Sequence, residues 1–334
     1  MGRRRVAING FGRIGRLTLR QLLGKKDVEV VAINDLTDNN TLAHLFKYDS
    51  AQGQYGGEVG ATDTELFIDG RAIRALSEPD PSQLPWKELQ VDLVLECTGR
   101  FRDRTGASKH IEAGASQVLI SAPAKSDDIP TFVMGVNHTQ IDPNQRILSN
   151  ASCTTNCLAP IVKLLDERFG IARGHMTTVH AYTADQRLQD APHRDLRRAR
   201  AAAVNMIPTT TGAAKALAKV YPPAKGKISA MAVRVPVITG SLIDLSVLLQ
   251  RDATAEEINQ HVQRAAQSEL RGIVQYTEAP IVSADIVGNT HSAIFDASLT
   301  TVHERFAHIV AWYDNEAGYA ARLADMAEYL CALR

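Results

Sequence analysis

One glycine-rich segment constrains the fold of this 334-residue chain more than any other feature. It reads Asn-Gly-Phe-Gly-Arg-Ile-Gly at residues 9–15, after a β-branched run (6–9) and before a run with helical apolar spacing (15–23). A Gly-x-Gly-x-x-Gly turn between a strand and a helix fits the pyrophosphate of a dinucleotide, because the helix N-terminus offers free N–H groups to it. Gly10 would allow the tight turn, Gly12 the approach of the phosphates, and Gly15 close packing of the helix on the strand. The same segment supplies Arg13 and Ile14 as cofactor-binding candidates.

An acidic residue follows this turn at the distance that a dinucleotide site requires. Asp35 comes directly after the second strand-like run, about 20 residues beyond the glycines, where a carboxylate binds the adenosine ribose hydroxyls. Its charge repels a 2′-phosphate, so the sequence favours NAD over NADP. The alternative interpretation is a glycine-rich turn with Asp35 in a solvated loop.

The order of the remaining runs predicts an α/β fold with two parts. Strand-like runs at 28–33, 93–97 and 118–121 alternate with helical patterns, which predicts an N-terminal Rossmann domain with a doubly wound parallel sheet. Beyond residue 150 the strand candidates become longer and partly alternating, as expected of an α+β domain with a mixed or antiparallel sheet. These candidates are 177–182, 228–236, 243–250, 293–300 and 306–313, and a helical pattern follows at 317–330.

The overall charge and the cysteine count limit the class of protein. Lys plus Arg and Asp plus Glu both number 37, so the balance gives no reason to expect a nucleic acid or an anionic membrane as partner. No stretch approaches the roughly 20 apolar residues of a membrane span. A chain of this length does not need its four cysteines for disulfides, so we expect a reduced, soluble, cytoplasmic protein with one reactive thiol.

The segment 149–157, Ser-Asn-Ala-Ser-Cys-Thr-Thr-Asn-Cys, carries the candidate nucleophile. It runs into an apolar helical pattern, so Ser152 is a plausible N-cap and Cys153 falls in the first helical turn. The N–H groups and the helix dipole there are expected to lower the pKa of the thiol and to hold an oxyanion. The alternative for Cys153 is a buried structural cysteine, which is the interpretation that we give to Cys157.

A histidine in the strand-like run 177–183 is the candidate base. His180 near a cysteine could form a thiolate–imidazolium pair and accept the proton when a thiohemiacetal gives up hydride. A single histidine on a strand is more often only packed or solvated. Neither His180 nor the other histidines show metal-ligand spacing with the cysteines, so no metal is expected.

Three motifs in the same order resemble the glyceraldehyde-3-phosphate dehydrogenase family. They are the glycine-rich segment, Ala-Ser-Cys-Thr-Thr-Asn-Cys at 151–157 and Trp-Tyr-Asp-Asn-Glu at 312–316, and the resemblance covers nearly the whole chain. It implies an NAD-binding domain at 1–152, a catalytic domain at 153–315, and a C-terminal helix at 316–334 that packs back on the first domain. It also implies that Cys153 is the nucleophile and His180 the base of an NAD-dependent, phosphorylating oxidation of glyceraldehyde 3-phosphate.

The resemblance extends to the binding residues. It implies that Asn315 fixes the nicotinamide amide, that Tyr319 packs near the ring, and that Thr98, Gly99 and Ser121 line the cofactor crevice. It implies that a phosphorylated aldehyde and inorganic phosphate are held by Ser152, Thr154, Thr183, Arg198, Thr211, Gly212 and Arg234. The arginine-rich segment 190–200 resembles a loop at a subunit interface, which favours a homotetramer over a solvated loop or a nucleic-acid patch.

Some residues depart from the family pattern and leave alternatives open. Residues 237–240, Val-Ile-Thr-Gly, replace the frequent Thr-Pro-Asn after Arg-Val-Pro, beside Arg234. Ala191 resembles forms that tolerate NADP, whereas Pro192 resembles NAD forms. An erythrose-4-phosphate dehydrogenase is the nearest alternative enzyme, and a non-catalytic NAD-binding protein with a second binding role is the alternative of another class.

Overall fold

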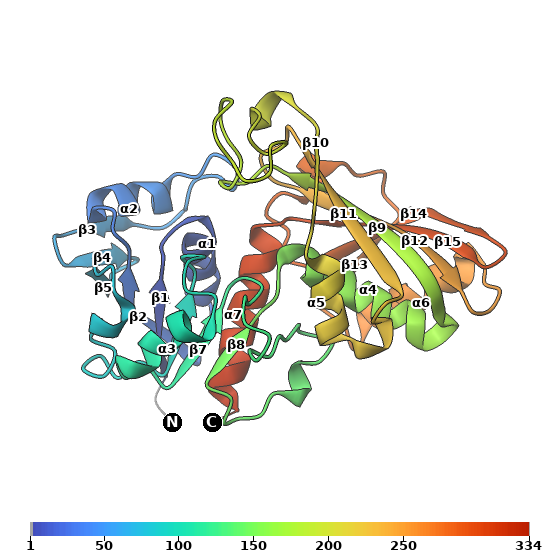
Figure 1. Ribbon diagram of the computed structural model, residues 1–334. Helices are drawn as coiled ribbons and strands as arrows, with labels where there is room; N and C mark the ends of the chain where they lie inside the picture. Colours follow the sequence, from blue (N-terminus) through green and yellow to red (C-terminus); the bar gives the residue numbers. More distant parts are fainter. Residues whose placement is uncertain (1–2, 334) are drawn as a thin grey trace. The chain divides into compact units, whose positions relative to one another are not determined.

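The computed structural model describes residues 3–333, which form two compact units (Figure 1). Among the described residues, the first unit comprises 3–132, 138–151 and 320–333, and the second comprises 133–137 and 152–319. Residues 1, 2 and 334, which belong to the ranges predicted for the first domain and the C-terminal helix, lie outside the described residues. Each unit is built around one β-sheet.

The first unit contains an eight-stranded sheet in the order β3-β4-β5-β2-β1-β6-β7-β8. All strand pairs from β5 to β8 are parallel, whereas β3, β4 and β5 form an antiparallel extension. The strands are β1 (Arg4–Asn9), β2 (Val28–Asn34), β3 (Val59–Ala61), β4 (Glu65–Ile68), β5 (Arg71–Leu76), β6 (Leu93–Glu96), β7 (Gln117–Ile120) and β8 (Ile147–Ser149). The chain crosses from β1 to β2 and later to β6 on its other side, which makes the sheet doubly wound.

Four helices belong wholly or partly to this unit. They are α1 (Arg13–Leu22), α2 (Asn39–Lys47), α3 (Arg104–Glu112) and the greater part of α7 (Ala317–Ala332). The side chains of Asp38 and Asp103 cap α2 and α3 by accepting from backbone N–H groups, as capping carboxylates do. Lys25, just beyond α1, donates to Asp325 at 2.6 Å and to Glu328 at 2.8 Å, so two charge-assisted bonds attach α7 to this unit.

The second unit contains a seven-stranded mixed sheet in the order β10-β11-β9-β12-β15-β14-β13. The pairs β11–β9 and β14–β13 are parallel and the other four are antiparallel. The strands are β9 (Ile171–Ala181), β10 (Ile207–Thr209), β11 (Ile228–Val235), β12 (Ser241–Leu249), β13 (Val274–Thr277), β14 (Ala293–His303) and β15 (Phe306–Tyr313). Together the two sheets confirm the predicted α/β fold with a parallel-rich first sheet and a mixed second one.

Helix α4 (Cys153–Phe169) is the central helix of the second unit and packs on β12, β15, β14 and β9. Ser152 begins it by accepting from the N–H of Thr155, and Gly170 ends it at φ 68°, where an L side chain would be strained. Helices α5 (Ala213–Val220) and α6 (Ala255–Gln267) flank α4. Short 3-10 helices in the chain are Pro81–Gln83, His138–Gln140, Ala202–Val204, Pro222–Ala224 and Ser283–Ile286.

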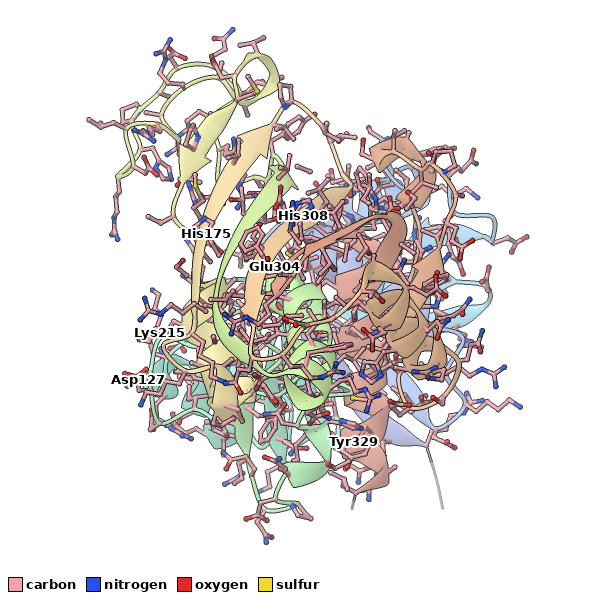
Figure 2. All side chains as sticks on the ribbon, turned by 90° about the vertical axis from the view of Figure 1, so that its right-hand side faces the viewer. Asp127, His175, Lys215, Glu304, His308 and Tyr329 are labelled. Carbon is pink, nitrogen blue, oxygen red and sulfur yellow. The ribbon has the colours of Figure 1, made fainter. Side chains whose placement is uncertain are left out.

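The strands of the second sheet alternate between buried apolar and more exposed residues. In β12, Ile243, Leu245 and Val247 are fully buried, whereas the residues between them are partly exposed. His175 on β9 and His308 on β15 belong to the more exposed set and are labelled in Figure 2. His175 bonds to Ser229 at 2.8 Å and His308 to Asp244 at 3.0 Å, so polar pairs cross this face of the sheet.

The structure extends several elements beyond their sequence patterns. The predicted strand 177–182 is the end of β9, which begins at Ile171, and the antiparallel strands β3 to β5 had no counterpart in the prediction. Many of their residues are partly exposed, so they do not form the continuous apolar run of a central parallel strand. Sequence patterning therefore located the fully buried strands better than the partly exposed ones.

Candidate active site and cofactor pocket

The glycine-rich turn is shaped by two close backbone contacts. Gly10 has φ 93°, and a Cβ there would lie 2.6 Å from the backbone nitrogen of Thr98. A Cβ on Gly15 would lie 2.2 Å from the carbonyl oxygen of Gly10. Gly12 differs, since no heavy atom lies within 4 Å of its ideal Cβ position, and it begins α1 without a side-chain cap. Space above uncapped N–H groups is what a pyrophosphate needs.

A pocket of about 260 Å³ opens at this turn, at the carboxyl ends of the parallel strands. This is the edge of an open α/β sheet where ligands bind. Its lining comprises Asn9, Gly10, Gly12, Asn34, Asp35, Leu36, Glu78, Pro79, Cys97, Thr98, Arg100 and Phe101. Leu36, which is 57% exposed, together with Pro79 and Phe101 gives the pocket apolar wall area suited to a flat base.

Asp35 lies in this pocket with its carboxylate held in place. One oxygen accepts from the N–H of Phe11 at 2.7 Å, and the other accepts from the N–H of Thr37 at 3.0 Å. Each carboxylate oxygen has a second lone pair, so the group can still accept from ligand hydroxyls. The pocket therefore presents a fixed negative charge, which suits a ribose diol and opposes a phosphate on it.

The other predicted cofactor residues lie at different distances from the pocket lining. Gly10, Gly12 and Thr98 line it, as Asp35 does, and Gly99 separates Thr98 from Arg100. Arg13 and Ile14 lie in the first turn of α1, where Arg13 forms two 3.0 Å bonds to Asp49. Ser121 follows β7 and interacts with the thiol of Cys97.

Sequence reasoning missed several lining residues. Asn9, Asn34, Glu78, Cys97, Arg100 and Phe101 were not among its candidates. Asn9 and Asn34 are each the last residue of a buried parallel strand and are themselves buried. A polar side chain at the end of an apolar strand was the signal that could have identified them.

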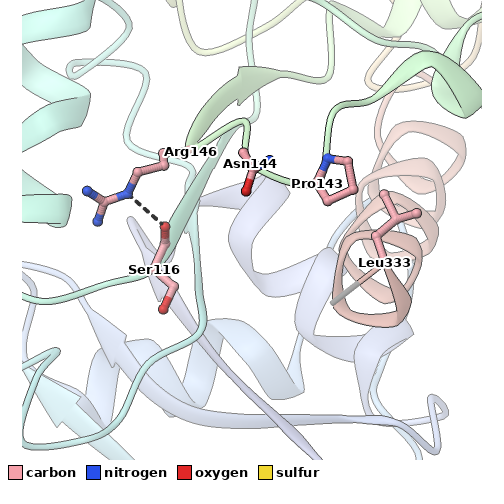
Figure 3. A pocket seen from close by; sticks show the side chains of 5 residues that line it. All are labelled: Ser116, Pro143, Asn144, Arg146 and Leu333. Carbon is pink, nitrogen blue, oxygen red and sulfur yellow. Dashed lines mark hydrogen bonds between the residues drawn. The ribbon is translucent and has the colours of Figure 1, made fainter.

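A larger hollow of about 500 Å³ lies elsewhere in the first unit and is lined by Ser116, Pro143, Asn144, Arg146 and Leu333 (Figure 3). Arg146 donates to the carbonyl oxygens of Ser116 and Ala115, both at 3.3 Å. Ser116 and Arg146 directly precede β7 and β8, so this hollow is at the amino ends of the strands. It lies at the opposite edge of the sheet from the glycine turn and does not compete with it as the nucleotide site.

In the second unit, the structure brings the predicted nucleophile and base together. Cys153 is the first residue of α4, and its Sγ lies 3.5 Å from Nε2 of His180 on β9. His180 is buried, whereas Cys153 is partly exposed. Arg234, on the neighbouring parallel strand β11, is in register with His180. A thiol, an imidazole and a guanidinium thus meet where a helix begins beside two strand ends.

The shortest contact of His180 favours a proton on Nδ1. Its Nδ1 lies 2.6 Å from the carbonyl oxygen of Ala181, which can only accept, so Nδ1–H is the donor. Arg234 Nη1 lies 2.8 Å from that Nδ1 and 3.0 Å from the same carbonyl, and it donates to the carbonyl because a protonated nitrogen cannot accept. The unprotonated Nε2 therefore faces Cys153, which is the tautomer that a general base requires.

The pKa values differ from the sequence expectation for the thiol. Burial raises the pKa of Cys153, and the opposing effects of Arg234 and of hydrogen bonds from Thr154 do not offset it. Burial, and then the charge of Arg234, lower the pKa of His180 to about 3. The predicted lowering of the thiol pKa is therefore wrong, and the thiol and the imidazole are both neutral at neutral pH.

A chain of hydroxyls supports the first turn of α4. Thr178 donates to the carbonyl oxygen of Leu242 at 3.0 Å and lies 2.8 Å from the Tyr313 hydroxyl, which lies 2.8 Å from that of Thr154. Because the hydroxyl hydrogen of Thr178 is already donated to Leu242, the Tyr313 hydroxyl donates to Thr178 and accepts from Thr154. The residue next to the nucleophile is thereby attached to the buried centre of the sheet.

Two buried donors of the second unit, one of them on Arg234, have no hydrogen-bond partner among the described residues. Within residues 3–333, Nε of Arg234 and Nε2 of Gln186 are buried and have no hydrogen-bond partner. Gln186 is 7% exposed and follows His180 by six residues, and its Oε1 accepts from the N–H of Thr183 at 3.4 Å. Buried donors without a partner are costly, and an anion bound at Arg234 would satisfy its Nε. Gln186 was not a sequence candidate.

The remaining phosphate-site candidates are held by contacts of their own. Arg198 donates to Asp185 at 2.6 Å, to the Thr209 hydroxyl at 3.0 Å and to the carbonyl of Thr210 at 3.2 Å. Its charge acts on both His180 and Arg234, so it belongs to the same electrostatic environment. The Thr211 hydroxyl accepts from the N–H of Ala213 at 3.2 Å.

Two further candidates lie at helix starts. Gly212 begins α5 without a side-chain cap, and no heavy atom lies within 4 Å of its ideal Cβ position. The Ser152 hydroxyl caps α4 through the N–H of Thr155 and bonds to its hydroxyl at 2.8 Å. Open space at the one start and a hydroxyl at the other are compatible with bound anions.

Asn315 is oriented by the segment that departs from the family pattern. Its Oδ1 accepts from the N–H of Gly240 at 3.2 Å and from the Ser241 hydroxyl at 2.9 Å, which leaves its amide NH₂ as the group that can contact a ligand. Gly240 has φ 92°, where glycine is favoured. Tyr319, the other nicotinamide candidate, is buried in the first turn of α7.

The described part of the chain lacks both a metal-binding cluster and a membrane-spanning helix. Among residues 3–333, no group of three or more His, Cys, Asp or Glu side chains is placed to hold a metal ion. Over the same residues, no helix combines the length and the apolar character needed to cross a membrane.

A doubly wound sheet with a glycine turn and an acidic ribose site, in a chain that also pairs a thiol with an imidazole, defines the class of NAD-dependent dehydrogenases. Residues 4–104 match the family model "Glyceraldehyde 3-phosphate dehydrogenase, NAD binding domain", and residues 152–315 match the C-terminal domain of the same family. The chain belongs to the glyceraldehyde-3-phosphate dehydrogenase family, and its cofactor is NAD.

Curated relatives agree over nearly the full length. The chain is 54% identical to glyceraldehyde-3-phosphate dehydrogenase from Geobacillus stearothermophilus and 56% identical to that from Streptomyces coelicolor, each over 98% of both chains. The protein of that name from Thermotoga maritima is 56% identical over 98% of both chains. These matches confirm the resemblance that the three motifs indicated.

Proposed function

We propose that the protein catalyses the phosphorylating oxidation of D-glyceraldehyde 3-phosphate to 1,3-bisphosphoglycerate, with NAD and inorganic phosphate as co-substrates. The observation that carries the proposal is the 3.5 Å contact between Cys153 Sγ and His180 Nε2 at the start of α4. The fit of NAD to the first unit rests on the open space at Gly12 and on the acidic group at Asp35. NAD, when bound, supplies the hydride acceptor.

Cys153 and His180 would act in sequence. Nε2 of His180 first takes the proton of the Cys153 thiol, and the thiolate attacks the aldehyde carbon. The imidazolium returns that proton to the carbonyl oxygen, which gives a thiohemiacetal. Its hydroxyl proton then passes back to Nε2 of His180 as hydride leaves the same carbon. The resulting thioester remains on Cys153. An oxygen of inorganic phosphate then attacks the acyl carbon, the C–S bond breaks, and an acyl phosphate and the thiolate are released.

Arg234 favours the reactive protonation states at both groups. Its positive charge stabilises a thiolate on Cys153, which lowers the pKa of that thiol against the effect of burial. The same charge disfavours an imidazolium and keeps His180 free to accept a proton. A phosphate bound to Arg234 would weaken that second effect and make His180 a stronger base in the substrate complex. We assign Arg234 and Thr183 to the substrate phosphate, and Ser152, Thr154, Arg198, Thr211 and Gly212 to the attacking phosphate and its surroundings.

The two units would divide the work between them. We propose that the first is the cofactor domain and the second the catalytic domain, with the ranges 1–152 and 153–315 and a C-terminal helix (316–334) that returns to the first. Thr98, Gly99 and Ser121 would line the cofactor crevice, while Asn315 and Tyr319 would hold the nicotinamide end. The NH₂ group that Asn315 leaves unused by Gly240 and Ser241 supports this role.

We further propose that the protein is a cytoplasmic homotetramer. The segment 182–206 exposes four large apolar side chains, each at least 76% exposed, which are Leu188, Leu196, Val204 and Met206. Such side chains favour burial against another protein surface, and the family pattern for this segment suggests a second copy. Cys97, Cys153 and Cys157 are free thiols, which is compatible with a reducing compartment. Size-exclusion chromatography with light scattering measures the oligomer directly.

The deciding experiment is NADH formation from glyceraldehyde 3-phosphate and NAD, with and without inorganic phosphate. We expect steady turnover only with phosphate, and a Cys153→Ser variant that loses activity by at least about a thousandfold because the alkoxide is not formed at neutral pH. Iodoacetamide should inactivate the enzyme through Cys153, and NAD should slow it. Comparable turnover on erythrose 4-phosphate, or activity retained by Cys153→Ser, would contradict the proposal.

A further inference from the structure

A fully buried carboxylate stands behind the cofactor pocket and has no part in the chemistry above. Glu96 is the last residue of β6, and its side chain is 0% exposed. Its Oε2 accepts from Asn9 Nδ2 at 2.6 Å and lies 3.0 Å from His110 Nε2. Its Oε1 accepts from the N–H of Thr98 at 2.8 Å and from the Thr98 hydroxyl. A buried charge with so many partners is a fixed point in the unit.

The protonation of His110 follows from a buried tryptophan. The indole Nε1 of Trp86 lies 3.0 Å from Nδ1 of His110, and an indole can only donate, so Nδ1 accepts. The ring proton is therefore on Nε2 and points at Glu96. Asn9 Nδ2, which lies 3.4 Å from that Nε2, directs its hydrogens to the carboxylate because two donors cannot bond to each other. Glu96 thus accepts four hydrogen bonds, two on each oxygen.

The network continues from Glu96 into the pocket wall. Asn9 Oδ1 accepts from Asn34 Nδ2 at 2.7 Å. Asn34 in turn bonds to the backbone of Glu78 in both directions, at 2.8 Å to its N–H and 2.9 Å to its carbonyl. Asn9, Asn34, Glu78 and Thr98 all line the cofactor pocket. One carboxylate therefore connects the ends of β1, β2 and β6 and the segment after β5.

We propose that Glu96, oriented by His110 and Trp86, is the positioning residue of the NAD pocket. It holds the Asn9 and Asn34 amides and the Thr98 turn in one arrangement before the cofactor arrives, so that binding does not have to order them. Asp35 directly follows Asn34, so the effect falls on the adenosine half of the cofactor. The inference rests on the proposed use of this pocket for NAD.

A Glu96→Gln substitution tests this directly. Glutamine has the shape of glutamate, but one of the two carboxylate oxygens is replaced by an NH₂ group. That NH₂ faces either the donors of Asn9 and His110 or the two donors of Thr98. In either orientation two hydrogen bonds to the side chain are lost and donors face each other. Dissociation constants for NAD and for ADP-ribose, which lacks the nicotinamide, are measured by isothermal titration calorimetry. We expect both to rise by about tenfold, with KM for NAD rising in parallel and kcat changing less than about twofold.

Gln117→Met is the matched control. Gln117 is also buried and lies at the opposite ends of the strands in the same sheet. Its side-chain NH₂ donates a hydrogen bond to the carbonyl of Gln145 at 2.7 Å, which is lost in the variant. We expect comparable destabilisation without a change in NAD affinity. Equal binding by Glu96→Gln and the wild type, or an equal loss in the control, overturns the inference. A wild-type protein that binds neither NAD nor ADP-ribose overturns the proposed pocket instead.

A second pair of variants decides the question if Glu96→Gln does not fold. His110→Gln keeps one acceptor for Trp86 and one donor for Glu96, whereas His110→Leu keeps neither. We expect His110→Leu to weaken ADP-ribose binding by about fivefold or more and His110→Gln to restore most of it. Affinities of the two variants that agree within twofold overturn the inference.

Discussion

The protonation of His180 gives a prediction that can be worked out in free energy. In the folded protein the pKa of His180 is lowered to about 3, against 6.5 for a histidine in water, because burial and Arg234 disfavour the imidazolium. Between these two values the unfolded chain binds a proton that the folded chain does not. The contribution of neutral His180 to the free energy of unfolding is therefore fully present above pH 6.5. It falls by about 1.4 kcal/mol per pH unit as the pH decreases, until it levels off near the pKa of the folded state.

From pH 7.5 to pH 5 this single group should remove about 2 kcal/mol from the free energy of unfolding. A His180→Gln variant cannot take up the proton and should lack this part of the pH dependence, whatever constant penalty the substitution adds. Urea unfolding at one protein concentration gives the free energy of unfolding of both proteins at the two pH values. The change between the pH values in the wild type, minus the same change in His180→Gln, isolates the contribution of His180, because the other titrating groups cancel.

His303→Gln is the control for this experiment, because His303 is exposed at the end of β14 and its surroundings change little on unfolding. The reasoning is refuted if the wild type and His180→Gln lose the same free energy between the two pH values, within about 0.5 kcal/mol. Such a result would mean that the folded protein accommodates an imidazolium beside Arg234, and the assignment of Nε2 as a standing acceptor would fail.

Three further predictions concern the pocket and the support of the nucleophile. Asp35→Ser removes the charge that opposes a 2′-phosphate, so the ratio of kcat/KM for NADP to that for NAD should rise by about tenfold or more; a change below twofold would contradict the role of Asp35. Gly12→Val adds a side chain where no neighbour lies within 4 Å, so thermal stability without ligand should stay nearly constant while NAD affinity falls; unchanged affinity would exclude Gly12 from the phosphate site. Tyr313→Phe leaves the buried hydroxyl of Thr154 without its acceptor and should lower the free energy of unfolding by about 1–3 kcal/mol; urea unfolding equal to the wild type would show that the hydroxyl chain adds nothing.

The sequence was most informative where local chemistry and position coincide. Gly10 has a positive φ and no room for a Cβ, so the backbone conformation at this position requires glycine. Ser152 before an apolar helical pattern placed Cys153 at a helix start, and the structure has α4 begin there. The β-branched run before Gly10 and the strand-like run before Asp35 located the carboxyl ends of β1 and β2. Each of these inferences depends on a few neighbouring residues.

Arrangements between distant segments were not accessible in the same way. Glu96 and His110, or Asn9 and Asn34, are separated by at least 14 residues, and nothing in their local sequence says that their side chains meet. The same holds for Gln186, whose buried amide becomes a candidate only when its surroundings are known. The strands β3 to β5 were missed because many of their residues are partly exposed, so they lack the continuous apolar signal of β1, β2 and β6.

By itself the sequence determined most of the buried strands, the glycine turn, the position of Cys153 at a helix start, and the family. Only the tertiary structure decided the protonation of the site, since the pKa of a thiol or an imidazole depends on burial and on charges from other strands. Arg234 reaches His180 because β11 pairs with β9, and the two residues are 54 positions apart. A helix start alone predicts a lowered pKa for Cys153, whereas the packed site raises it, because the free energy of desolvation exceeds what one guanidinium and the N–H groups return.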